Sequence, residues 1–138
     1  MYLLDTNVIS ELRKTTRANS GVIRFFEESS EKEEQLFLSA VTIGEIRRGV
    51  DRIQYRGDKL QAEKLEAWLQ TVVIDYADNI LNFSRTEAQV WGKLRVPHAE
   101  NAIDKQIAAT ALTHDLTLVT RNIKDFKSTG VILLNPFE

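Results

Sequence analysis

The chain has 138 residues, of which 43% are hydrophobic, and this predicts a single globular domain over residues 1–138 with an ordinary apolar core. It has no cysteine and only two histidines, which excludes disulfides and argues against a zinc site built from cysteine or histidine. The net charge of −2 lacks the overall basic balance typical of nucleic-acid-binding proteins, although the charges are unevenly placed along the chain.

The first residues contain neither the basic nor the apolar stretch of a signal peptide. No segment approaches the roughly 20 apolar residues that a membrane span needs. We therefore expect a cytoplasmic protein that does not enter a membrane.

Short apolar segments alternate with longer amphipathic ones. Apolar residues that recur at steps of three and four, such as Ile43, Ile46 and Val50, indicate helices. The alternation predicts an α/β fold in which helices cover both faces of a mostly parallel central sheet. The expected strands are Tyr2–Leu4, Leu36–Leu38, Ile80–Asn82, Leu116–Val119 and Val131–Leu134, and the expected helices are Asn7–Lys14, Ser20–Glu28, Thr42–Gln54, Asp58–Tyr76, Arg85–Arg95 and Asn101–His114.

Three acids far apart in the sequence stand where such a fold would bring them to one edge of the sheet. Asp5 closes the first strand, and Glu45 and Asp104 each fall in the first turn of a predicted helix. In parallel sheets, functional residues gather beyond the carboxyl ends of the strands. Carboxylates that converge without matching cations are costly unless a divalent metal neutralises them, and oxygen ligands favour Mg²⁺ or Mn²⁺.

Further oxygen ligands follow the same strands. Thr6 comes directly after Asp5, Thr120 and Asn122 follow the fourth strand, and Asp125 is a weaker fourth carboxylate. Arginines close to these positions are candidates for contacts with phosphate, because a guanidinium pairs well with phosphate oxygens. These arginines are Arg47, Arg48 and Arg121.

Each acid also has a purely structural explanation. Thr42 and Glu45 fit a capping box. Asp104 could offset the dipole of its helix, and Asp5 could cap the helix that follows it. The aromatic residues on amphipathic helices, Phe25, Phe26 and Trp68, are expected in the core, although exposed ones would mark a partner surface.

Four segments resemble, in order, the four motifs of the PIN-domain family. They are Leu3–Glu11, Leu38–Ile46, Asp104–Ala111 and Leu118–Asn122, the last followed by Asp125–Phe126. The ending Leu134–Phe137 is similar to that of the VapC and FitB-like branch. The resemblance implies a compact α/β/α sandwich, usually a homodimer, that acts as the ribonuclease toxin of a toxin–antitoxin pair. It further implies cleavage of RNA with Mg²⁺ or Mn²⁺, and silencing by a cognate antitoxin that also binds operator DNA.

By motif match, the resemblance assigns the acidic catalytic and metal-binding site to Asp5, Glu45 and Asp104. The chain departs from the family at the fourth motif, where an acid is often found and Asn122 stands here. An amide supplies an oxygen but no charge, so occupation of a second metal site is left open, with Asp125 as a partial substitute.

Three alternatives stay open at this point. The chain could be a PIN-domain nuclease that processes RNA without being a toxin, or a PIN domain that binds a partner and has little catalysis. A phosphoryl-accepting receiver would also gather acids around Mg²⁺, but it would need paired acids after the first strand, which the sequence lacks.

Overall fold

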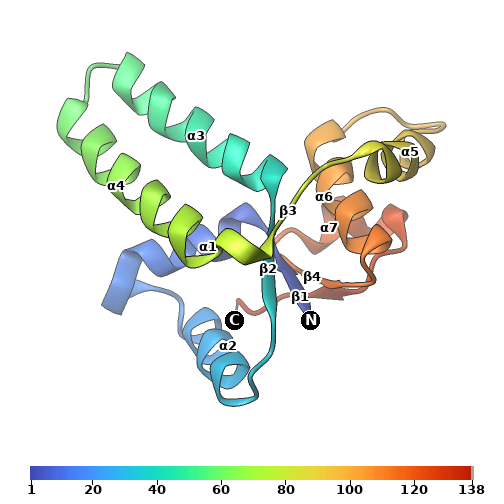
Figure 1. The fold of residues 1–138 in the computed structure, drawn as a ribbon, viewed down its shortest axis with the longest axis horizontal. Helices are drawn as coiled ribbons and strands as arrows, with labels where there is room; N and C mark the ends of the chain where they lie inside the picture. Colours follow the sequence, from blue (N-terminus) through green and yellow to red (C-terminus); the bar gives the residue numbers. More distant parts are fainter. Residues whose placement is uncertain (138) are drawn as a thin grey trace.

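A parallel sheet forms the centre of the protein in the computed structural model, which describes residues 1–137 (Figure 1). Its strands are β1 (Tyr2–Leu4), β2 (Leu36–Ser39), β3 (Ile80–Leu81), β4 (Thr117–Val119) and β5 (Leu133–Leu134), in the order β3-β2-β1-β4-β5. In the central strand, Tyr2 pairs with Leu36 of β2, and Leu4 pairs with Val119 of β4. The predicted parallel arrangement is confirmed, and every strand pair within residues 1–137 is parallel.

The helices lie close to the predicted positions. They are α1 (Thr6–Glu11), α2 (Ser20–Glu31), α3 (Ala40–Tyr55), α4 (Lys59–Asp75), α5 (Arg85–Leu94), α6 (Ala102–Thr113) and α7 (Ile123–Phe126), with 3-10 segments at Leu12–Arg17, Ala77–Asn79 and Lys127–Thr129. The first predicted helix was too long, because the chain tightens into a 3-10 segment after Glu11 and Thr15 adopts a positive φ of 54°. Across residues 1–137, no helix combines the length and the apolar character that crossing a bilayer requires.

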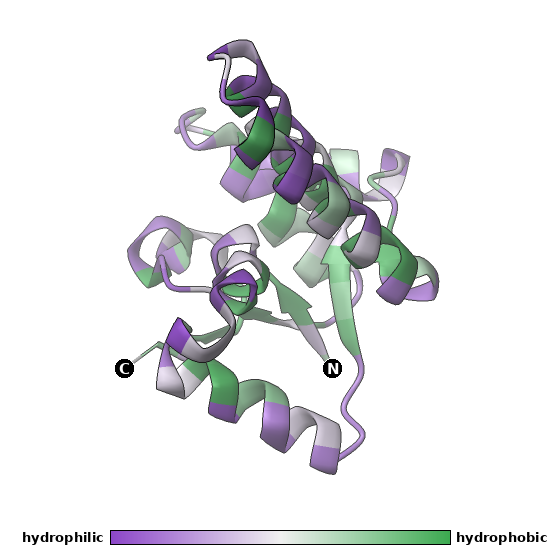
Figure 2. Ribbon diagram, turned by 90° about the vertical axis from the view of Figure 1, so that its left-hand side faces the viewer, coloured by the Kyte–Doolittle hydropathy of each residue, from purple (hydrophilic) through white to green (hydrophobic). Residues whose placement is uncertain are grey.

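Two apolar clusters cover the two faces of the sheet, because successive side chains of a strand point to opposite faces. Leu4 packs with residues of α1 to α4, including Val22, Ile46 and Leu69. Leu3 points the other way and packs with α6 and α7, where Phe126 is fully buried. Figure 2 shows hydrophobic residues along the strands and hydrophilic ones on the outer sides of the helices. The result is a three-layer α/β/α sandwich.

The expected core aromatics belong to the first of these clusters. Phe25, Phe26 and Trp68 are partly buried and pack against it. All three pack against the core as predicted, although Phe25 and Trp68 also line surface hollows.

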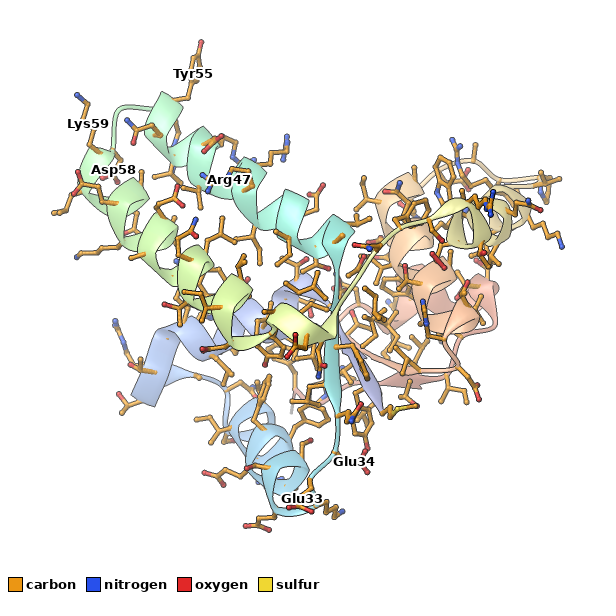
Figure 3. The ribbon with its side chains drawn as sticks, in the orientation of Figure 1. Glu33, Glu34, Arg47, Tyr55, Asp58 and Lys59 are labelled. Atoms are coloured by element: carbon orange, nitrogen blue, oxygen red, sulfur yellow. The ribbon has the colours of Figure 1, made fainter. Side chains whose placement is uncertain are left out.

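Helices α3 and α4 form a hairpin that extends beyond the sheet (Figures 1 and 3). Arg47 on α3 joins the two helices, because its two terminal nitrogens each lie 2.7 Å from an oxygen of Glu66 on α4. The same guanidinium donates to Asp51 at 3.0 Å. These bonds raise the pKa of Arg47 and hold the pKa of Glu66 at about 2. The guanidinium of Arg47 is thus occupied by ion pairs within the hairpin.

The order of the strands explains where a site can form. From β1 the chain first adds β2 and β3 on one side of the sheet, and later adds β4 and β5 on the other. Strand order therefore reverses between β1 and β4, and such a reversal leaves a crevice at the carboxyl ends of the strands. Asp5 directly follows β1 and Thr120 directly follows β4.

Candidate active site

An open pocket of about 350 Å³ brings the three predicted acids together. Its lining comes from the end of β1, from α1, α3 and α6, and from the turn after β4: Asp5, Thr6, Asn7, Glu45, Ile103, Asp104, Ile107 and Asn122. Two of the predicted supporting residues, Thr6 and Asn122, are in this lining, whereas Thr120 and Asp125 are outside it. Residues from four separate parts of the sequence therefore share one cavity.

Asp5 is held in place by a network of hydrogen bonds. Its side chain is only 6% exposed. One carboxylate oxygen accepts from the amide of Thr6 at 2.8 Å, and the other accepts from the hydroxyl of Thr120 at 2.7 Å and from Nδ2 of Asn7 at 3.3 Å. Burial raises the pKa of Asp5, while these three bonds oppose that rise. The carboxylate is therefore oriented, but no cationic side chain among residues 1–137 is paired with it.

Thr120 connects this network to the turn after β4. Its Oγ1, which donates to Asp5, accepts from the amide of Asn122 at 3.0 Å. Asn7 closes a second link, because its Oδ1 accepts from the amide of Arg121 at 3.1 Å. The ends of β1 and β4 are thus joined by side chains as well as by the sheet.

Asn7 is a site residue that the sequence analysis did not identify. The apolar pattern places Asn7 only at the start of the first predicted helix. A usable signal was present, because Asp5-Thr6-Asn7 and Thr120-Arg121-Asn122 both place threonine and asparagine directly after a strand. Side chains of these types commonly bond to backbone amides in such turns.

Glu45 and Asp104 are positioned by helices but are not held by hydrogen bonds. Neither makes a hydrogen bond or ion pair with any residue among 1–137, and both are partly buried. The pKa of Asp104 is raised to about 6, first by burial and then by the negative charges of Asp5, Asp125 and Glu45. Three neighbouring carboxylates therefore disfavour the ionised form of Asp104, and no cation within residues 1–137 is paired with it.

The structural explanations for the three acids hold only in part. Helix α3 begins at Ala40, where the hydroxyl of Ser39 accepts from the amide of Val41 at 3.0 Å. The predicted capping box at Thr42 is therefore wrong, and Glu45 lies in the second turn. Asp104 does lie in the first turn of α6, whereas Asp5 both caps α1 and faces the pocket.

The donor atoms of the pocket suit a hard divalent cation. Asp5, Glu45 and Asp104 offer carboxylates and Asn122 offers an amide oxygen, which are ligands of Mg²⁺ and Mn²⁺ rather than of zinc. As the side chains stand, no three acidic or histidine side chains within residues 1–137 form a ready ligand set. Because Glu45 and Asp104 have no hydrogen bonds to break, rotation of their side chains is the movement that would close the set.

The three candidate arginines lie in different surroundings. Arg47 is outside the pocket lining, and its guanidinium is occupied by Glu66 and Asp51, which leaves it poorly placed to bind phosphate. Arg48 is exposed on α3 and is also outside the lining. Arg121 is exposed beside Asn122, with its guanidinium carbon 4.9 Å from the ring centre of Phe137.

Comparison with known proteins gives consistent matches over the whole chain. The family model described as PIN domain matches residues 2–132. The chain is 35% identical to Toxin FitB of Neisseria gonorrhoeae, over 99% of both chains. It is 32% identical to VapC ribonuclease Y4jK of Sinorhizobium fredii, over 100% of this chain and 99% of the relative. Solved structures of the same fold include a toxin–antitoxin complex from Klebsiella pneumoniae, with 26% identity, a TM-score of 0.71, and coverage of 100% of this chain and 99% of that chain. Another is FitAB bound to an IR36 DNA fragment, with 32% identity and a TM-score of 0.78. That alignment covers 100% of this chain and 96% of the FitAB chain.

Proposed function

Because this chain belongs to the PIN-domain family, we propose that it is a metal-dependent ribonuclease and the toxin of a VapBC-type toxin–antitoxin pair. The names of its relatives support a toxin with ribonuclease activity. The observation that carries the metal-dependent chemistry is the shared pocket of Asp5, Glu45 and Asp104, in which the carboxylates repel one another and lack cations. A phosphodiester brings further negative charge, which such a pocket accepts only with a cation.

Each acid has a distinct part in this proposal. Asp5 and Asp104 would be the main ligands of Mg²⁺ or Mn²⁺, and Glu45 would bind the metal or position the attacking water. When bound, the metal lowers the pKa of water and offsets charge on the phosphate. The bonds from Thr6, Asn7 and Thr120 fix Asp5 in one orientation, which is the role of outer residues around a metal ligand.

The neutral side chain of Asn122 bears on the number of metal ions. It lines the pocket but contributes no charge, and Asp125 lies outside the lining while its charge still affects Asp5 and Asp104. The proposal therefore needs only one metal ion. Calorimetric titration of Mn²⁺ would measure the number of sites directly.

The test is digestion of a mixed single-stranded RNA by the purified protein. Cleavage should require Mg²⁺ or Mn²⁺, stop with EDTA, and be lost in Asp5→Asn and Asp104→Asn, both of which should remain folded. The matched control is Asp78→Asn, an exposed acid outside the pocket lining, which should cleave normally. Full activity in either site variant, or in EDTA, would refute the proposed chemistry.

An antitoxin partner is part of the same proposal, and the surface beside the pocket suits one. A hollow between α1 and the α3–α4 hairpin shares Thr6 and Glu45 with the carboxylate pocket. Its remaining lining combines apolar side chains with two arginines and a serine: Ile46, Val50, Ile53, Leu65, Trp68, Gly49, Ser10, Arg13 and Arg52. An amphipathic antitoxin segment that filled this hollow would cover Glu45 and so prevent access to the site.

Toxicity separates this proposal from an RNA-processing role. Expression of the wild-type chain should arrest growth, and co-expression of the protein encoded beside it should relieve the arrest. In the same proposal the chain forms a homodimer in the cytoplasm and reaches operator DNA only through the antitoxin. Active nuclease without growth arrest would favour RNA processing instead.

A further inference from the structure

Two hollows adjoin the carboxylate pocket, and their chemistry differs. The first, beside α1 and the α3–α4 hairpin, is lined by five apolar side chains together with Arg13 and Arg52. The second shares Asn122 with the pocket and encloses about 350 Å³. We call it the C-terminal hollow, and five of its six lining residues have polar or charged side chains: Arg121, Asn122, Ile123, Lys124, Asp125 and Asn135.

The two cations of the C-terminal hollow are available to a ligand. Arg121 and Lys124 are both exposed, and neither forms an ion pair with a residue among 1–137. Asp125 is the one carboxylate in the lining. Arg47 is the contrasting case, because both of its terminal nitrogens already bind Glu66. The carboxylate of Glu11, which is paired with Lys14, also acts electrostatically on Arg121. The lining of the hollow thus carries one net positive charge beside a pocket rich in negative charge.

The position of Arg121 is fixed from two sides. Its guanidinium lies over the ring of Phe137, and the amide of Phe137 donates to Oδ1 of Asn135 at 2.9 Å. The backbone amide of Arg121 donates to Oδ1 of Asn7, and Nδ2 of Asn7 donates to Asp5. Stacking on a ring leaves the edge of a guanidinium free to donate hydrogen bonds. The cation is therefore preorganised relative to the acid that we assign as a metal ligand.

The neutral Asn122 stands between the two compartments. Its amide is held by Thr120, and its exposed side chain lines both the pocket and the C-terminal hollow. An acid at this position would place a negative charge between the carboxylate pocket and the C-terminal hollow. An amide instead permits a polyanion to pass, and can donate a hydrogen bond to it.

We propose, on the basis of the RNA hydrolysis proposed above, that the C-terminal hollow binds the RNA phosphate next to the one that is cleaved. Arg121 and Lys124 contact this phosphate, and Asn122 lets the backbone continue into the carboxylate pocket. A single-stranded polyanion gains affinity mainly from such cationic contacts. The hollow beside α1 and the α3–α4 hairpin also contains two arginines, Arg13 and Arg52, but five apolar side chains line it as well.

The experiment measures how RNA binding depends on salt. Arg121→Gln and Lys124→Gln are made in the cleavage-deficient Asp104→Asn protein, with Lys127→Gln as the matched control. Lys127 is an exposed lysine nearby in the chain that is outside the hollow, so the charge change is the same. Binding of a fluorescein-labelled mixed-sequence single-stranded RNA is followed by anisotropy, in Mg²⁺ buffer with increasing KCl.

Each of the two variants should lower the slope of log K against log salt by about 0.7, the value for one lost phosphate contact on a single strand. In the otherwise wild-type enzyme, the same variants should raise KM and leave kcat unchanged, because these contacts bind substrate and transition state alike. Slopes and KM values equal to those of Lys127→Gln would overturn the inference.

The remaining outcomes separate this inference from the proposed function. If the wild-type protein neither binds nor cleaves RNA, both proposals fail together. If it cleaves RNA normally while Arg121→Gln and Lys124→Gln match the control, only the C-terminal hollow is excluded. If these variants instead lose antitoxin binding and keep the RNA salt slope, the hollow is a protein interface and the inference falls.

Discussion

Removing the charge of Asp104 should stabilise the metal-free protein even as it abolishes the proposed RNA cleavage. The pKa of this carboxyl rises from 3.8 to about 6, because it is partly buried and faces Asp5, Asp125 and Glu45. A shift of this size corresponds to about 3 kcal/mol between the two protonation states. Solvent around the half-buried group screens part of that energy. We therefore expect Asp104→Asn to raise the free energy of unfolding by about 1–2 kcal/mol at pH 8, or Tm by about 3–8 °C.

The sign of the effect depends on pH. The folded pKa lies above the unfolded one, so the ionised form of Asp104 is the one that the fold disfavours. At pH 4 and below, the carboxyl is protonated in most folded molecules and the wild-type protein pays little of this cost. The cost grows as pH rises from the unfolded pKa to about 6, and is constant above it. The advantage of the asparagine variant should follow the same course.

Thermal unfolding followed by circular dichroism tests this reasoning. Wild type, Asp104→Asn and the exposed control Asp78→Asn are compared in EDTA at pH 4, 6 and 8. Added Mg²⁺ should then raise the Tm of the wild-type protein and have less effect on Asp104→Asn, because a ligand that binds only the folded state stabilises it. The reasoning is refuted if Asp104→Asn is less stable than wild type at pH 8, or if its advantage is the same at pH 4.

Three further changes test other parts of the structure. Thr120→Val removes the hydroxyl that donates to Asp5 and should lower the free energy of unfolding by about 1–3 kcal/mol. It should also weaken Mn²⁺ binding by about 10–100-fold in a calorimetric titration. Thr120→Ser keeps the hydroxyl and should retain both the stability and the Mn²⁺ affinity. Arg47→Gln should leave the kcat/KM for RNA cleavage unchanged and lower only Tm, because the guanidinium of Arg47 joins α3 to Glu66 on α4. A loss of activity would mean that Arg47 contacts the RNA after all. Phe126→Ala empties a fully buried position and should cost about 3–5 kcal/mol in urea unfolding, and a smaller loss would mean that the α6–α7 face repacks.

The sequence was sufficient to predict the layers and the order of the main elements, because their apolar periodicity is strong. It did not predict α7, since four residues are too few to show a helical period. Strand β5 was predicted two residues too long at its start, because Val131 is buried but is not paired in the sheet. Element ends depend on hydrogen bonds to distant residues, which apolar spacing does not report.

Some features of the candidate site were likewise predictable from the sequence, and others were not. The convergence of Asp5, Glu45 and Asp104 was predictable, because the ends of parallel strands meet at one edge and the motif order fits a known family. The occupation of Arg47 was not predictable, since it depends on how α4 folds back onto α3 and on which face Glu66 presents. Arg47 and Arg121 look equivalent as isolated arginines, and only tertiary contacts distinguish them.

The bond between Thr120 and Asp5 joins residues 115 positions apart in the chain. Protein synthesis runs from the amino terminus, so Asp5 leaves the ribosome long before the strand that orients it. A nascent or prematurely terminated chain that lacks β4 therefore cannot assemble the oriented carboxylate, however well its first half folds. Such fragments should therefore lack the proposed nuclease activity, because the chain completes the oriented carboxylate only after β4 has been made.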